Sequence, residues 1–105
     1  MIFVIADDKS LDVFDNVEAI QGACEGVDVE NGVYRFFGDN GRPLKPRFII
    51  PNEKGQSWVV SGRYDLIEDV DNKTTLMDNM NSSLSLENNM HFKTKEEIKR
   101  FLTSK

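Results

Sequence analysis

Hydrophobic and polar residues follow different periods along this chain, and each period predicts a different element. Met1 to Ala6 is a short apolar run, typical of a strand buried on both faces, whereas Ser10 to Phe14 alternates with a period of two. The polar triplet Asp7-Asp8-Lys9 between them predicts a tight turn. We therefore expect residues 1 to 14 to form a β-hairpin.

The next segment combines a helix signal with strand signals. Asp15 precedes Glu18 by three residues, the spacing of a capping box, and predicts a short helix that ends near Gly22 to Gly26. The β-branched and aromatic residues from Val27 to Phe37 then predict strand, a turn or bulge at Gly32, and a second strand. The sequence GDNG at 38–41 predicts a hairpin turn.

Prolines and glycines divide the middle of the chain. Pro43 and Pro46 cannot donate backbone hydrogen bonds, which places Arg47 to Ile50 at a sheet edge or at the start of a new strand. Ser57 to Ile67 predicts a long strand, with a bulge or a close backbone approach at Gly62. Trp58 lies between strand-forming residues, and we expect it in the core.

Helical periodicity returns in the last third. Leu76, Met77, Met80 and Leu84 recur every three or four residues and predict an amphipathic helix from Thr74 to Leu86, within an Asn-rich passage at 72–89. The capping box that begins at Thr94 predicts a final helix whose apolar face carries Ile98, Phe101 and Leu102. Strands followed by helices indicate an α+β fold with an antiparallel sheet of about five strands, one inserted helix and two C-terminal helices.

Composition is consistent with a single domain that spans residues 1 to 105. The chain is 39% hydrophobic and contains seven Phe, enough for one core without a metal or disulfide. The first ten residues lack the features of a signal peptide, and no apolar run approaches the roughly 18 residues of a membrane span. Together with a single cysteine, these features predict a cytoplasmic protein with no membrane partner.

Charge is distributed in alternating blocks that sum to −5. Residues 1 to 41 and 64 to 91 are acidic, whereas 42 to 63 and 92 to 105 are basic. Such blocks do not suit a phosphate backbone, so we expect no direct binding of nucleic acid. Acidic surfaces do steer basic proteins toward them. The alternative is that the excess carboxylates only keep the chain soluble.

The residues needed for catalysis are sparse. Cys24 and His91 are the only cysteine and histidine. We expect Cys24 to be a small buried side chain at a helix end, and His91 to have a capping or packing role before the last helix. Calcium loops that would start at Asp28 or Asp69 lack the required glycine or acids, and no glycine-rich phosphate loop is present. We therefore expect no cofactor, no metal and no enzymatic activity. A hydrolase built on the carboxylate clusters is the alternative.

Four stretches in the first half resemble a family of small bacterial proteins. They are SLDVF at 10–14, VEA at 17–19, DVENGVYRFF at 28–37 and GRPL at 41–44. This pattern is similar to that of immunity proteins encoded beside polymorphic toxins, including those of contact-dependent growth inhibition systems, and it covers residues 1 to 47. The resemblance implies a protein that neutralises a toxin domain by binding it tightly, without catalysis.

Many toxins of such systems attack nucleic acid and carry a basic cleft, to which an acidic surface is complementary. We therefore expect a nuclease toxin domain as the partner, bound through acids at turns and strand ends. An adaptor or subunit with an incidental acidic face is the other alternative. The candidate partner-binding residues are Asp7, Asp8, Asp12, Asp28 and Glu30 in one region and Glu68, Asp69 and Asp71 in a second.

Overall fold

A computed structural model describes residues 1–81 and 83–104 of the chain. In chain order the described elements are β1 (Ile2–Ala6), β2 (Ser10–Phe14), α1 (Val17–Ala23), α2 (Gly26–Glu30), β3 (Tyr34–Phe37), β4 (Pro43–Ile50), β5 (Glu53–Lys54), β6 (Val59–Val60), β7 (Arg63–Glu68), α3 (Leu76–Asn79), β8 (Ser85–Leu86) and α4 (Lys95–Thr103). No described helix is long and apolar enough to cross a membrane.

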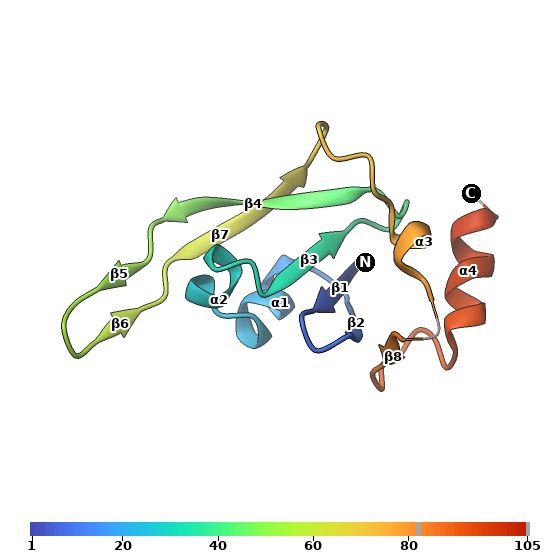
Figure 1. The fold of residues 1–105 in the computed structure, drawn as a ribbon, viewed down its shortest axis with the longest axis horizontal. Helices are drawn as coiled ribbons and strands as arrows, with labels where there is room; N and C mark the ends of the chain where they lie inside the picture. The colour runs from blue at the N-terminus through green and yellow to red at the C-terminus, as the bar shows by residue number, and fades with distance from the viewer. Residues whose placement is uncertain (82, 105) are drawn as a thin grey trace.

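The main sheet has the strand order β7-β4-β3-β1-β2-β8 among the described residues (Figure 1). Neighbouring strands in this sheet are antiparallel, except that β2 and β8 are parallel to each other. The α+β class and the mostly antiparallel sheet are thus confirmed. Two details differ from the expectation: both α1 and α2 lie between β2 and β3, and β8 adds a strand after α3.

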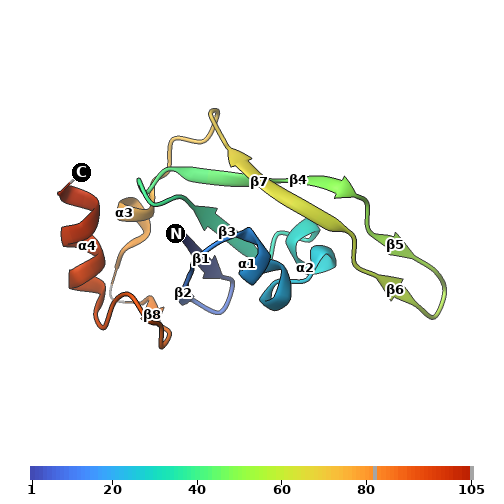
Figure 2. The ribbon, with the colours of Figure 1, turned by 180° about the vertical axis from the view of Figure 1, so that it is seen from behind.

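The central strand β1 separates two apolar cores. Phe3 and Ile5 point to one face, where they pack with residues of α3 and α4 such as Leu76 and Ile98. Val4 points to the other face and packs with Ile20 of α1 and Val29 of α2. Because side chains alternate along a strand, a continuous apolar run serves both cores, as the sequence predicts. Helices therefore cover both faces of the sheet (Figures 1 and 2).

The strand predicted to begin at Val27 is wrong, because this segment forms helix α2. Its end explains the glycine: Gly32 has φ 77°, its N–H bonds to the carbonyl of Val29 at 3.1 Å, and the N–H of Val33 bonds to that of Asp28 at 3.1 Å. This pair of bonds is the Schellman motif, in which a left-handed glycine ends a helix. The same positive φ also occurs at strand bulges, so the glycine alone does not discriminate.

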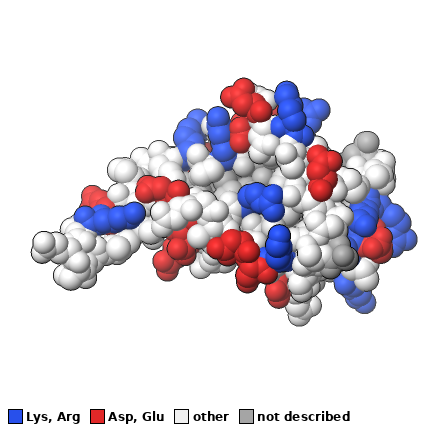
Figure 3. Space-filling model, in the orientation of Figure 1, with Lys and Arg blue, Asp and Glu red and all other residues white. Residues whose placement is uncertain are grey.

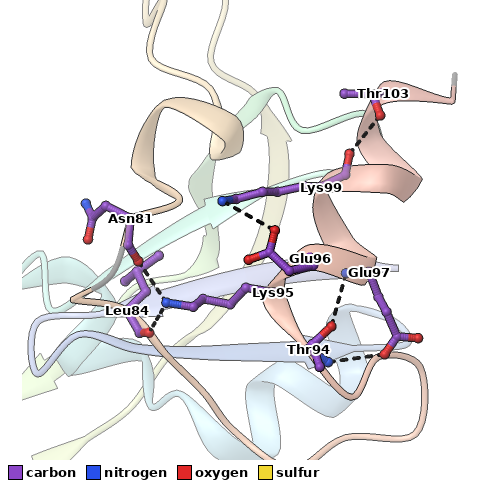
Figure 4. A network of polar contacts seen from close by, with 8 residues as sticks. All are labelled: Asn81, Leu84, Thr94, Lys95, Glu96, Glu97, Lys99 and Thr103. Atoms are coloured by element: carbon purple, nitrogen blue, oxygen red, sulfur yellow. Dashed lines mark hydrogen bonds and ion pairs between the residues drawn. The ribbon is translucent and has the colours of Figure 1, made fainter.

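Side chains cap α1 and α4 as the sequence predicts, although the capping residue of α1 differs. Asn16 caps α1 by accepting from the Ala19 N–H at 2.9 Å, so the capping residue is Asn16 and not Asp15. The predicted box of Thr94 and Glu97 is confirmed at the start of α4 (Figure 4). Lys95 then donates its ammonium to the carbonyls of Asn81 at 2.9 Å and Leu84 at 2.8 Å. This contact fastens α4 to the segment that leads into β8.

The helix expected from Thr74 to Leu86 is much shorter than its periodicity indicates. It is limited to α3, and β8 follows, while position 82 lies outside the described residues. Leu76, Met80 and Leu84 are buried nonetheless. The Asn81 side chain accepts from the Ser83 N–H at 2.9 Å, a local bond that competes with helix. Pairing of β8 with β2 satisfies backbone groups that a longer helix would otherwise use.

Strand β4 starts earlier than the prolines indicate. It begins at Pro43 and runs through Pro46, but it pairs with β3 only as far as Leu44 and with β7 from Leu44 onward. Arg47 to Ile50 are therefore partnered on one side only, as expected of an edge. Pro46 is tolerated because no β3 residue requires its missing N–H.

The long strand expected from Ser57 to Ile67 is interrupted. It consists of β6 and β7, with Gly62 between them; an added Cβ at Gly62 would collide with the Ile50 carbonyl oxygen and lie 2.6 Å from the Pro51 carbonyl carbon. The predicted close backbone approach at Gly62 is confirmed. Strands β5 and β6 form a separate antiparallel pair, and we call residues 49 to 62 the arm. The arm and α4 lie at opposite ends of the long axis, which spans 47 Å (Figures 1 and 2).

Candidate protein-binding site

Residues 10 to 34 contain six acids and no Lys or Arg, and they fold into β2, α1, α2 and the start of β3. We call these acids the acidic layer: Asp12, Asp15, Glu18, Glu25, Asp28 and Glu30. Asp15 contacts His91, with Oδ1 to Nε2 at 2.5 Å, whereas the other acids of the layer form no ion pair with a described residue. The α1–α2 side of the protein therefore carries an excess of negative charge, with Arg63 lining a pocket beside Glu18.

The turn between β1 and β2 extends this negative region. Asp7 and Asp8 are exposed there, with Lys9 between them and β2. Hydrogen bonds from the side chain and the backbone of Ser10 lower the pKa of Asp8, and the backbone bond to Asp8 Oδ1 measures 2.9 Å. Asp8 is thus held in its charged form by the turn itself. Acidic side chains gather along the lower edge of the protein in Figure 3, below α2 and the β1–β2 turn, with basic groups between them.

Asp12 is one of two half-buried members of the first predicted cluster, the other being Asp28. It pairs with Val4, which places its side chain on the α1–α2 face at the middle of β2. Burial raises the pKa of Asp12, and the negative charges of Glu87 and Asp8 raise it further. These three carboxylates come from β2, the β1–β2 turn and the segment after β8. They repel one another, and folding alone does not neutralise them.

The remaining members of the first cluster are only partly brought together. Burial raises the pKa of the Cys24 thiol to about 11, and the charges of Asp12 and Asp28 contribute in the same direction. Burial also raises the pKa of Tyr34, with contributions from Cys24, Asp28 and Asp7. Asp7, Asp12 and Asp28 therefore act on one region. Glu30 points elsewhere, because it accepts from the Asn52 side chain at the base of the arm at 3.2 Å.

The second predicted cluster lies at the opposite end of the strands. Glu68 ends β7, and the Asp69 N–H donates to the Pro43 carbonyl at 3.0 Å, next to the β3–β4 turn. Glu68 and Asp69 line a shallow pocket with Arg42 and Lys73, whereas Asp71 is exposed in the following turn. This cluster is therefore separate from the first, and bases adjoin it.

Cys24 and His91 occupy the positions that the sequence indicates. Cys24 is 3% exposed at the end of α1, and its carbonyl accepts from the Tyr64 hydroxyl at 2.8 Å. His91 lies before α4, where the Asn89 side chain accepts its backbone N–H at 2.9 Å and its ring contacts Asp15. No group of three or more His, Cys, Asp or Glu among residues 1–81 and 83–104 is arranged to hold a metal ion.

The arm carries a surface that the sequence does not predict. Trp58, expected in the core, is 51% exposed, which is a correction. Its apolar neighbours on the arm are also exposed: Ile49, Ile50, Val59 and Val60. The sequence feature that could have indicated this exposure is the polar stretch NEKGQS at 52–57. Such a stretch forms a solvent-exposed turn, so the strand ends that flank it also lie away from the core. Clustered exposure of large apolar side chains is typical of an interaction surface.

Asn52 joins the arm to the acidic layer. Its side-chain amide donates to the Gly26 carbonyl at 3.0 Å and to Glu30, and its oxygen accepts from the Gly62 N–H at 2.7 Å. One side chain thus connects the two strands at the base of the arm with α2. The apolar arm and the acidic layer are neighbouring parts of one surface.

Comparison with known proteins gives no relative: no protein-family model, no curated protein and no solved structure matches this chain.

Proposed function

We propose that this protein is a cytoplasmic immunity protein that binds and neutralises a basic toxin domain of the nuclease class. The observation that carries the proposal is the acidic layer, in which 25 consecutive residues without Lys or Arg form β2, α1, α2 and the start of β3. The resemblance of residues 1 to 47 to immunity proteins agrees with it.

Electrostatics supports a basic partner. A nuclease binds phosphates through Lys and Arg, and opposite charge across an interface raises the association rate and excludes wrong partners. The raised pKa of Asp12 reflects burial and repulsion from Glu87 and Asp8. A cationic partner surface would relieve that repulsion, so binding gains free energy that the free protein cannot obtain. Asp7 and Asp8 extend the same surface.

Charge reversal of the first cluster tests this proposal. Asp7→Lys with Asp28→Lys alters carboxylates that form no hydrogen bond with another described residue, so the fold should be retained. We expect the association rate with the inactivated toxin domain encoded by the neighbouring gene to fall by about tenfold or more. Surface plasmon resonance measures this rate, and survival of toxin-expressing cells measures protection.

The second cluster provides a matched control. Glu68→Lys with Asp71→Lys changes the net charge by the same amount at two exposed positions. We expect a much smaller loss of association rate, because this cluster lies at the opposite end of the strands from the acidic layer. Equal losses in both variants would show that only net charge matters. Unchanged rates and unchanged protection in both would contradict the proposal and favour the adaptor alternative.

A further inference from the structure

Each face of the arm carries exposed apolar side chains beside one charged residue, Glu53 on one face and Lys54 on the other. Val60 pairs with Glu53 and Val59 pairs with Lys54, so the two valines point to opposite faces. Trp58 lies on the Val60 face, with its indole ring against Gly55. A ribbon with apolar side chains on both faces cannot bury them by lying flat on a surface. It must enter a cleft with a wall on each side.

The arm is held in position before any partner binds. Its base continues the β4–β7 pairing, which runs from Leu44 opposite Glu68 to Ile50 opposite Arg63. Asn52 then fixes the base to α2, and the backbone approach at Gly62 leaves no space for a side chain. An element ordered in the free protein loses less conformational entropy on binding, which favours its use as a docking element.

Charge argues against a second copy of this chain as the occupant, because two copies that met at the arm would bring the acids of α2 of both copies to the same contact. Edge-to-edge pairing of two arms would also leave both faces of the ribbon in water. A protein cleft can instead enclose both faces of the arm and extend over α2.

Charge defines the rim of that cleft. The bond between Asn52 and Glu30 places the arm beside the acidic layer. All charged residues of α2 and of its flanking position 25 are acidic. We infer that the arm inserts between two apolar walls of a cleft in the toxin domain, with Trp58, Val59 and Val60 as the buried anchors and with Lys or Arg of the toxin facing α2. This inference rests on the proposed function and assigns the residues that slow dissociation.

The single tryptophan provides a direct test. This chain contains one Trp, so 5-fluorotryptophan incorporated into it gives one ¹⁹F NMR signal, from Trp58. We expect the signal to shift and to lose its sensitivity to D₂O when the unlabelled, inactivated toxin domain is added. Binding that leaves the signal and its solvent sensitivity unchanged would overturn the inference and leave the proposed function intact.

Dissociation kinetics provide the second test. Val59→Ser with Val60→Ser should raise the dissociation rate from the same toxin domain by about tenfold or more while the association rate changes little. Val70→Ser is the matched control, because Val70 is 67% exposed and lies outside the arm. Equal dissociation rates in the arm variant and the control would overturn the inference.

Two further outcomes separate the inference from the proposed function. If the unmodified protein does not bind the toxin domain, the proposed function and the inference that rests on it both fail. If sedimentation shows that the free protein dimerises and that the arm variant does not, the arm is a contact between copies, and only the inference is overturned. Binding with a protected Trp58 and faster dissociation of the arm variant supports both.

Discussion

Single glycines show how closely residue type and backbone space are matched. Gly62 packs against the backbone of Ile50 and Pro51, where an added Cβ has no room, whereas a Cβ at Gly22 in α1 would meet no atom within 4 Å. The structure therefore requires glycine at position 62, where there is no space for a Cβ, but gives no reason for glycine at position 22.

Alanine at these two positions should change stability in opposite directions. Gly62→Ala is expected to lower the free energy of unfolding by at least about 1–3 kcal/mol, because the backbone of the arm must move. Gly22→Ala should raise it by about 0.5–1 kcal/mol, because alanine has the higher helix propensity. Urea denaturation followed by circular dichroism measures both values. A neutral Gly62→Ala would show that the base of the arm adapts freely.

At the scale of elements, the edge strand β7 and the arm differ in what they expose to solvent. On β7 the Gln21 side chain donates to the Tyr64 carbonyl at 2.8 Å, and the Asp65 side chain accepts the Leu66 N–H at 2.8 Å. These side chains occupy backbone groups that another strand would pair with, a known protection against edge-to-edge association. The arm has exposed apolar side chains instead. This contrast agrees with a specific role for the arm in binding.

The contact between the arm and α2 depends on Asn52. Asn52→Ala removes bonds to Gly26, Glu30 and Gly62, and leaves the Gly62 N–H without its partner. We expect the free energy of unfolding to fall by about 1–3 kcal/mol. Hydrogen exchange of the Gly62 amide, measured by NMR, should accelerate as the base of the arm opens.

Asn88→Ala is the control for this variant. Asn88 is exposed and its side chain forms no hydrogen bond with another described residue, so stability should stay within about 0.5 kcal/mol of the parent. If Asn52→Ala behaves like this control, the arm is held by β4–β7 pairing alone.

At the scale of the whole molecule, negative charge from separate segments meets at Asp12. Its pKa is raised above the ordinary value of 3.8, first by burial and then by Glu87 and Asp8. A raised pKa means that the folded state disfavours the carboxylate, so ionised Asp12 lowers the free energy of unfolding at neutral pH. This cost declines as pH falls through the folded pKa, and it vanishes below 3.8, where Asp12 is protonated in both states.

Asp12→Asn should therefore be more stable than the parent at pH 7. The difference should shrink as pH falls, because protonation removes the same charge from the parent. Urea denaturation between pH 7 and pH 3.8 measures this difference in the free energy of unfolding. The control is Asp71→Asn, at the other end of the strands, which should give a smaller gain at pH 7. A parent that is more stable than Asp12→Asn at pH 7 would contradict the assigned repulsion.

Much of the local structure was predictable, because its causes are short-range. The β1–β2 hairpin, the turn at 38–41, the Thr94 box and the burial of Cys24 follow from neighbours in the chain. The segment around Val27 was not predictable, because a glycine with positive φ serves a bulge as well as a helix end. The exposure of Trp58 likewise depends on the position of the arm relative to both cores.

The amino-acid sequence by itself determined the α+β class, the apolar run that serves both faces of the sheet and the segment of 25 residues without a base. These are properties of composition and period, which survive any arrangement of the elements. Only the tertiary structure decided that β8 replaces the second half of a predicted helix, that the acids of α2 adjoin the arm, and that Trp58 and its valine neighbours lie in solvent. Each of these depends on contacts between segments distant in sequence, where packing and backbone pairing outweigh local preference.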